Sequence, residues 1–81
     1  MTREEIEAAV RAEIEEVAPD AELIGLDPEA DIRDALDLDS MDVMNIIVAL
    51  HARLGAEIPD ADVPQLLTLN GAVDYLSAKL G

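Results

Sequence analysis

The sequence predicts an all-α protein, a four-helix bundle with three longer helices, a short third helix and a long first loop. Apolar residues recur every three or four positions in three segments, the spacing that places them on one face of a helix. Pro19, Gly25, Pro28 and Gly55 interrupt these segments, as expected of connections between helices. The 81 residues suffice for one small domain, 1–81, with one modest core, and helices of this length assemble around such a core as a bundle.

The first helix is predicted over Arg3–Val17. Thr2 at the N-cap and Glu5 three residues later match the capping box, in which each side chain bonds the other residue's backbone N–H. Pro19 and Asp20 end the helix. Its Glu and Arg side chains are expected to face solvent, and the stripe expected to be buried comprises Ile6, Ala9, Val10, Ile14 and Val17.

Residues 18–39 form a connection that is long for a compact domain, and such connections are usually functional or contain short structure of their own. Ile32 and Leu36 are four residues apart, so we expect a turn of helix there. Five apolar side chains are expected to anchor the connection to the core: Leu23, Ile24, Leu26, Ile32 and Leu36.

The most apolar helix is predicted over Ser40–Leu54 and ends at Gly55. Its inward stripe comprises Val43, Ile46, Ile47, Leu50 and Leu54. A second stripe, formed by Met41, Met44 and Val48, lies on an adjacent face. Either a small domain wraps more than half of this helix, or the second stripe is exposed and docks a partner. We favour docking, because flexible and polarisable Met side chains suit such a surface.

The remaining two helices follow a connector. A short third helix is predicted over 61–67, with Asp62 as its expected cap and Pro64 in its first turn, the one place where Pro is tolerated. The last helix begins after Thr68 as N-cap. Its apolar positions are Leu69, Ala72, Val73, Leu76 and Leu80.

The net charge of −14 disfavours nucleic acid and anionic membrane surfaces as partners and favours enzymes with basic docking surfaces. The same charge opposes self-association, so a monomer is expected. The absence of Cys excludes disulfides and thiolate metal sites. Because the chain also lacks a signal-peptide pattern and a membrane-spanning run, we expect it in the cytoplasm.

Ser40 stands at the start of the most apolar helix, where a Ser ordinarily caps the first turn. Catalysis by Ser40 within one chain is not expected, because the only His, His51, lies eleven residues later and about 16 Å along the helix axis. Asp39 and Asp42 are not a glycosidase pair either, because so small a bundle offers no suitable cleft.

The acidic loop also fails the calcium-binding pattern of an EF-hand. Asp37 and Asp39 fit its first and third positions, but Met41, Asp42 and Val48 do not supply the ligands and the Gly that follow. No metal site is therefore predicted.

The segment Asp39-Ser40-Met41-Asp42 resembles the Asp-Ser-Leu attachment motif of acyl carrier proteins. Three further segments resemble the end of that family's second helix, the connector after it and the final helix: Ala49-Leu50, Glu57-Ile58-Pro59-Asp60 and Ala72-Val73-Asp74-Tyr75-Leu76. These pieces occur in the family's order and spacing, and the order of predicted elements matches the acyl carrier protein fold across nearly the whole chain.

The chain departs from the family pattern at several positions. Met41 replaces the motif Leu, and Asp37 replaces the Gly common in the preceding turn, where a left-handed conformation is needed. Asn45, His51 and Ala52 stand where typical bacterial fatty-acid carriers are acidic, which favours a specialised pathway. Pro64 is also unusual in the family's third helix.

The resemblance implies that a phosphopantetheinyl transferase attaches a 4′-phosphopantetheine arm to Ser40, with Asp39, Met41 and Asp42 around the attachment site. The protein would itself catalyse nothing. It would hold acyl groups as thioesters and present them to acyl-transferring or condensing enzymes of fatty-acid or polyketide biosynthesis. The residues assigned to the partner-facing surface are Asp37, Leu38, Met44, Asn45 and Val48.

Three alternatives follow from the resemblance. We favour a free-standing acyl carrier, because Met1 immediately precedes the first helix and Gly81 follows the last. A carrier-like structural module that is never modified would have no need of Ser40. A peptidyl or D-alanyl carrier would share the fold and the arm but deliver aminoacyl cargo. The aliphatic core also raises the hypothesis that a fatty chain is sheltered beside Val43, Ile47 and Leu67.

Overall fold

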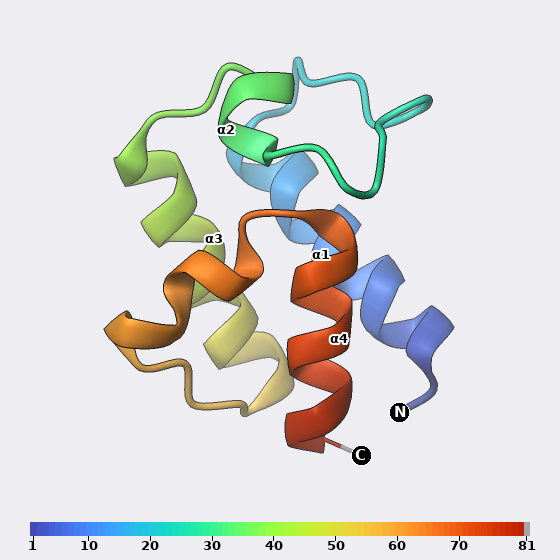
Figure 1. Cartoon of the computed structure of the whole chain (residues 1–81), viewed down its shortest axis with the longest axis vertical. Helices are drawn as coiled ribbons and strands as arrows, with labels where there is room; N and C mark the ends of the chain where they lie inside the picture. Colours follow the sequence, from blue (N-terminus) through green and yellow to red (C-terminus); the bar gives the residue numbers. More distant parts are fainter. Residues whose placement is uncertain (81) are drawn as a thin grey trace.

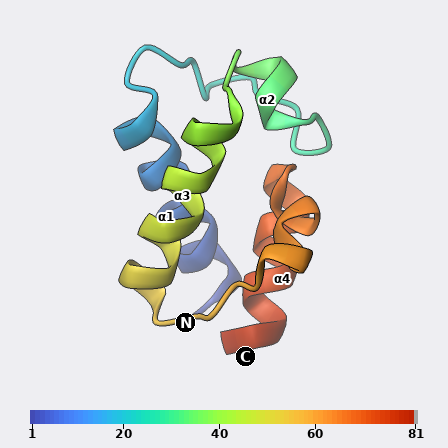
Figure 2. The same ribbon diagram turned by 90° about the vertical axis from the view of Figure 1, so that its left-hand side faces the viewer.

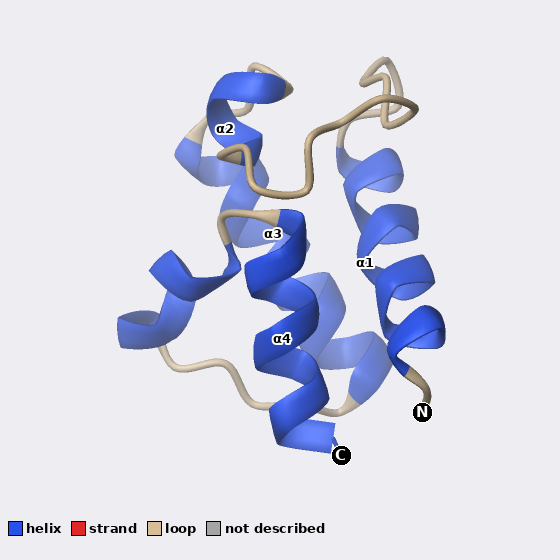
Figure 3. Cartoon of the chain, turned by 45° about the vertical axis from the view of Figure 1, so that its right-hand side comes forward, coloured by secondary structure: helices blue, strands red, loops and turns tan. Residues whose placement is uncertain are grey.

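The computed structural model describes residues 1–80, and within that range every regular element is a helix (Figure 3). The all-α prediction is thereby confirmed. In chain order the elements are α1 (Arg3–Val17), α2 (Ile32–Ala35), α3 (Ser40–Leu54), the 3₁₀ helix η1 (Asp60–Leu66) and α4 (Leu69–Leu80). None of these helices has the length and apolar composition required to cross a bilayer.

The three long helices form the body of the molecule. Helix α1 packs against both α3 and α4, and η1 packs against α4. Figure 1 shows α4 and η1 in front of α1 and α3, and Figure 2 shows the loop before α2 crossing one end of the bundle together with α2. The start of α3 lies at this same end, so the first loop and α2 are neighbours of Ser40 in space.

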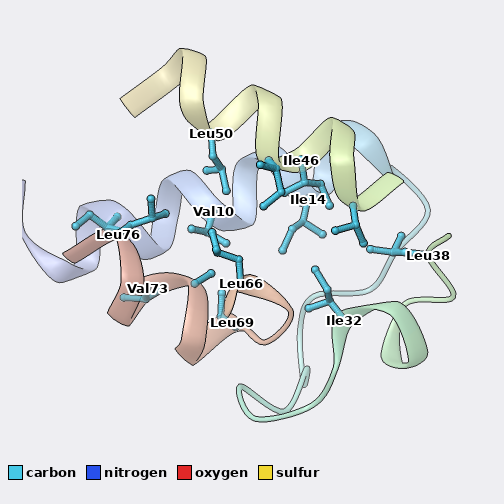
Figure 4. Packing of buried hydrophobic residues seen from close by; sticks show 14 of the residues in the cluster. Val10, Ile14, Ile32, Leu38, Ile46, Leu50, Leu66, Leu69, Val73 and Leu76 are labelled. Carbon is cyan, nitrogen blue, oxygen red and sulfur yellow. The ribbon is translucent and has the colours of Figure 1, made fainter. Parts of the chain in front are cut away.

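The core between these helices is entirely aliphatic. Its most deeply buried large side chains include Ile6, Ile14, Leu50, Leu69 and Leu76, all with less than 2% of their surface exposed. Each such burial stabilises the fold by about 1.5–3 kcal/mol relative to exposure. Figure 4 shows the cluster extending from Leu76 at one end to Leu38 and Ile32 at the other. The predicted inward stripes of α1, α3 and α4 are buried except at Val17, Leu54 and Leu80, which are partly exposed.

Helix α1 begins as predicted, with a capping box between Thr2 and Glu5. The expectation that its charged residues all face solvent is wrong at Glu13, which is only 7% exposed. Its carboxylate accepts a hydrogen bond from the guanidinium of Arg53 on α3, at 3.1 Å. This pair joins α1 to α3 and compensates a charge whose burial would otherwise be costly.

Two backbone hydrogen bonds hold the second half of the long first loop against the residues around the start of α4. The Ile32 N–H donates to the Leu67 carbonyl at 2.8 Å, and the Asn70 N–H donates to the Pro28 carbonyl at 3.0 Å. Helix α2 provides the expected turn, capped by the Asp31 side chain, which accepts from the Arg33 N–H.

One predicted loop anchor is wrong. Ile24 is 97% exposed, whereas Leu23 is buried and Leu26 is partly buried against the core. The turn at Ile24 and Gly25, where Gly25 has φ 87°, directs Leu23 inward and leaves its neighbour in solvent.

The third helix differs from its prediction. It begins at Asp60 as a 3₁₀ helix, and Pro64 is its fifth residue, not a member of its first turn. An interior Pro removes an α-helical hydrogen bond and clashes with the preceding turn, which favours the tighter 3₁₀ form here. Asp62 does not cap this helix. It accepts a hydrogen bond from the Tyr75 hydroxyl at 2.6 Å, which raises the pKa of Tyr75 to about 12 and joins η1 to α4.

Helix α4 begins after Thr68 as predicted, because the Thr68 hydroxyl accepts from the Gly71 N–H at 2.9 Å. Gly71 packs against the backbone of Gln65 near the end of η1. A Cβ atom at this position would collide with the Gln65 carbonyl oxygen and lie 2.8 Å from Oγ1 of Thr68. The close approach of η1 to α4 therefore requires glycine at position 71.

Replacing Gly71 with Ala should lower the free energy of unfolding by about 1–3 kcal/mol, because the backbone of η1 must move away from α4. Helix propensity alone predicts the opposite, a gain of about 1 kcal/mol. Urea denaturation followed by circular dichroism distinguishes the two, with Ala52→Gly on the exposed face of α3 as the control for propensity. A stabilised Gly71→Ala protein would show that η1 is not closely packed.

Candidate functional site

Ser40 is the first residue of α3 and is exposed. The ordinary capping role of a Ser at a helix start falls instead to Asp39, whose carboxylate accepts from the Asp42 N–H at 2.9 Å. The Asp42 carboxylate in turn accepts from the Asp39 N–H at 3.3 Å, which completes a capping box. The two acids that bracket Ser40 thus bond each other's backbone, and the Ser40 hydroxyl is left free for other chemistry.

The turn before Ser40 has a left-handed residue. Asp37 has φ 55° and is the one non-glycine residue within 1–80 with a positive φ. Asp tolerates this conformation better than most residues, which explains how it stands where acyl carrier proteins commonly have Gly. The reversal lets the Leu38 N–H bond the Arg33 carbonyl at 2.9 Å and returns the chain towards α3.

The assignment of Leu38 to the partner-facing surface is wrong. Its side chain is only 8% exposed and belongs to the core cluster (Figure 4). Two residues further on, Ser40 is exposed. Leu38 therefore anchors the start of α3 to the core and, by doing so, presents Ser40 to solvent.

The second apolar stripe of α3 is exposed, as predicted. Met41 is 66%, Met44 38% and Val48 63% exposed, and Asn45 beside them is also exposed. Between Asp42 and Glu57 the chain has no acidic residue. A neutral, apolar strip (Met41, Met44 and Val48) therefore begins beside Ser40 and runs along α3 in a strongly acidic protein.

Behind α3 lies a small enclosed cavity of about 10 Å³, whose walls include Val43, Ile47 and Leu66. A space of this size holds about one water molecule, far less than an acyl chain. Of the residues expected beside a sheltered chain, Val43 and Ile47 line this cavity and Leu67 does not. Shelter in the core would require the helices to separate.

Within residues 1–80 the structure places no His beside Ser40. His51 is exposed near the far end of α3, and no group of three or more His, Cys, Asp or Glu residues within 1–80 is arranged to hold a metal ion. What this end of α3 does offer is hydrogen-bond donors. The N–H groups of Ser40 and Met41 have no acceptor within residues 1–80, and the helix dipole points its positive end at them. An anion attached to Ser40, such as a phosphodiester, fits this position.

Sequence reasoning missed two features that position the site. The Glu13–Arg53 pair was missed because a charged residue is expected in solvent, although Glu13 lies three residues after Val10 and four after Ala9, a spacing that places it on the buried face of α1. The Asp39–Asp42 capping box has a signal in the sequence, since the two acids are three residues apart. It was missed because Ser40, which lies between them, is also a residue type that commonly caps helices.

Comparisons with known proteins agree with this geometry. A family described as "Phosphopantetheine attachment site" matches residues 5–76. The chain is similar to an acyl carrier protein of Acidothermus cellulolyticus, at 35% identity over 95% of this chain and 90% of that protein. It is also similar to an acyl carrier protein of Rubrobacter xylanophilus, at 37% identity over 94% of this chain and 93% of that protein.

Replacing Asp39 with Ala should lower the free energy of unfolding by about 1 kcal/mol, because the Asp42 N–H loses its acceptor. Asn caps helices about as well as Asp, so Asp39→Asn should retain most of the stability while removing the same charge. Urea denaturation of both variants measures the difference. Equal losses would mean that the charge of Asp39, and not its capping bond, stabilises α3.

Proposed function

The chain belongs to the acyl carrier protein family, and on this basis we propose that it holds acyl intermediates as thioesters on an arm attached to Ser40 and presents them to enzymes of fatty-acid or polyketide type. Proteins of this family are non-catalytic carriers whose prosthetic group is 4′-phosphopantetheine. The observation that carries the proposal is the exposed Ser40 hydroxyl at the first position of α3, with capping assigned to Asp39.

Attachment of the arm uses Ser40 as the nucleophile. Its Oγ forms a bond to the phosphorus of coenzyme A that carries the pantetheine, and the pyrophosphate P–O bond breaks. Adenosine 3′,5′-bisphosphate leaves, and the Ser40 proton passes to a base of the transferase, since His51 lies far along α3. Once bound, the arm supplies the thiol that this Cys-free chain lacks.

Electrostatics at the site favour basic partners. Asp37, Asp39 and Asp42 surround the first turn of α3, and a phosphodiester on Ser40 would add further negative charge. Enzymes that approach Ser40 therefore gain from a basic docking surface, which speeds their encounter with the carrier and makes it salt-sensitive. Because like charges also repel copies of this chain, we propose that it acts as a monomer, in the cytoplasm, as one carrier domain over 1–81.

The apolar strip of α3 is the proposed contact for biosynthetic enzymes. This strip consists of Met41, Met44 and Val48, with Asn45 beside it, and it suits an apolar pocket on the partner enzyme. The partners of typical fatty-acid carriers would instead have basic residues at this contact. The neutral character of this face supports a specialised pathway with its own enzymes.

Incubation with coenzyme A, magnesium and a broad-specificity phosphopantetheinyl transferase should add one phosphopantetheine to the natural protein and none to Ser40→Ala. Intact-protein mass spectrometry measures the addition. The substitution is on the surface and leaves the Asp39–Asp42 capping box in place, so the variant should fold. If the folded natural protein gained no mass, the chain would be an unmodified carrier-like module.

The specialised-pathway proposal predicts that Asn45→Glu should strengthen binding to a fatty-acid ketosynthase by about twofold to fivefold, the range expected of one exposed ion pair. Isothermal titration calorimetry at low salt measures the dissociation constant. Ala8→Glu, on the exposed face of α1, is the matched control for an added negative charge. An Asn45→Glu affinity no higher than that of Ala8→Glu would contradict the proposal.

A further inference from the structure

A surface groove lies between the first loop and α2. Its volume is about 510 Å³, and Ala21, Leu26 and Leu36 are among the apolar residues that line it. Figures 1 and 2 show the loop and α2 together at the end of the bundle where α3 begins. Unlike the closed core cavity, this groove is open to solvent and large enough to receive side chains of another protein.

The groove leads towards the attachment site. A second hollow of about 340 Å³ shares Asp20, Ala21, Leu36 and Asp37 with it and extends to Asp42. Asp42 is in the first turn of α3, two residues from Ser40. The two hollows adjoin at these four residues, and we call them together the loop groove; its lining extends from the first loop to the first turn of α3.

Ile24 stands in the wall of the loop groove. It is 97% exposed, the highest value among the large hydrophobic side chains of residues 1–80. A single exposed apolar residue is common on protein surfaces and means little alone. Ile24 differs because it adjoins a groove that Ala21, Leu26 and Leu36 also line, so an inserted side chain would bury Ile24 together with these residues. This arrangement is typical of a binding anchor.

The charge of the loop groove defines its complement. Asp20, Glu22, Asp27 and Asp37 line it, and no Lys or Arg side chain does. Arg33, the basic residue of α2, already forms an ion pair with Asp31, with 2.7 Å between Nη2 and Oδ2. A segment that enters the groove would therefore be favoured if it carried basic residues around an apolar one.

We propose that the loop groove is a docking surface for the phosphopantetheinyl transferase, which inserts a basic segment whose apolar side chain packs on Ile24. The inference rests on the proposed function. The transferase is the one partner whose reaction takes place at Ser40 Oγ itself, so its active site must meet the surfaces that adjoin this atom. Enzymes that act at the far end of a long arm have no such requirement.

The test uses the full chain with Ser40→Ala, which binds the transferase without turnover. Ile24→Ser in this background should raise the dissociation constant for a broad-specificity phosphopantetheinyl transferase, in the presence of coenzyme A and magnesium, by about tenfold. Calorimetry measures the constant. Because Ile24 makes so little contact with the fold, the urea midpoint should not change.

A charge comparison gives the second readout. Asp20→Asn combined with Glu22→Gln should weaken binding and reduce its salt dependence more than Glu4→Gln combined with Glu57→Gln. All four residues are exposed. The control residues belong to the first turn of α1 and to the connector after α3, two segments at the end of the bundle opposite α2 (Figure 1).

Binding of Ile24→Ser within about twofold of its parent, or equal effects of the two charge pairs, would overturn the inference. Failure of the proposed function is distinguishable from this result, because the natural protein with Ser40 intact would then gain no phosphopantetheine in the mass measurement.

Discussion

Burial of the inner face of α3 against α1, in a core that α4 shares, is the constraint on which the rest of the structure depends. The core has no aromatic side chain, so each long helix must contribute an aliphatic stripe, and Ile14, Leu50 and Leu76 are almost completely enclosed. With that face buried in the core, the adjacent face of α3 is left uncovered by the rest of residues 1–80. The exposure of Met41, Met44 and Val48 is thus a consequence of small size, since a bundle of this length cannot cover a helix on all sides.

The proposed attachment site depends on how α3 begins. Leu38 anchors the chain in the core, and the capping box between Asp39 and Asp42 starts the helix immediately afterwards. These two devices hold Ser40 at the surface without using its hydroxyl. The site therefore separates two roles that a Ser at a helix start would ordinarily combine, stabilising the helix and serving function. A carrier needs this separation, because a nucleophile engaged in a capping bond is less available to a modifying enzyme.

The surface around Ser40 has two different sides. Towards the body of α3 it is neutral and apolar, and towards the first loop it is grooved and acidic. A carrier must be recognised in turn by the enzyme that modifies it and by enzymes that use its cargo. Surfaces of different chemistry on the two sides of Ser40 allow different partners to bind at each stage. An apolar partner surface is favoured on one side, and a basic partner surface on the other.

Local patterns in the sequence determined the helices and indicated Ser40 as the candidate attachment residue. The periodic stripes, the Thr2 and Thr68 caps and the Gly55 ending all follow from spacing and capping chemistry within a few residues. Only the tertiary structure decided that Arg53 pairs with Glu13, that Asp62 bonds Tyr75 instead of capping η1, that Leu38 packs inward and that Ile24 is in solvent. These outcomes rest on contacts between segments far apart in the chain, or on the direction of a turn, and neither is encoded in the spacing of neighbouring residues.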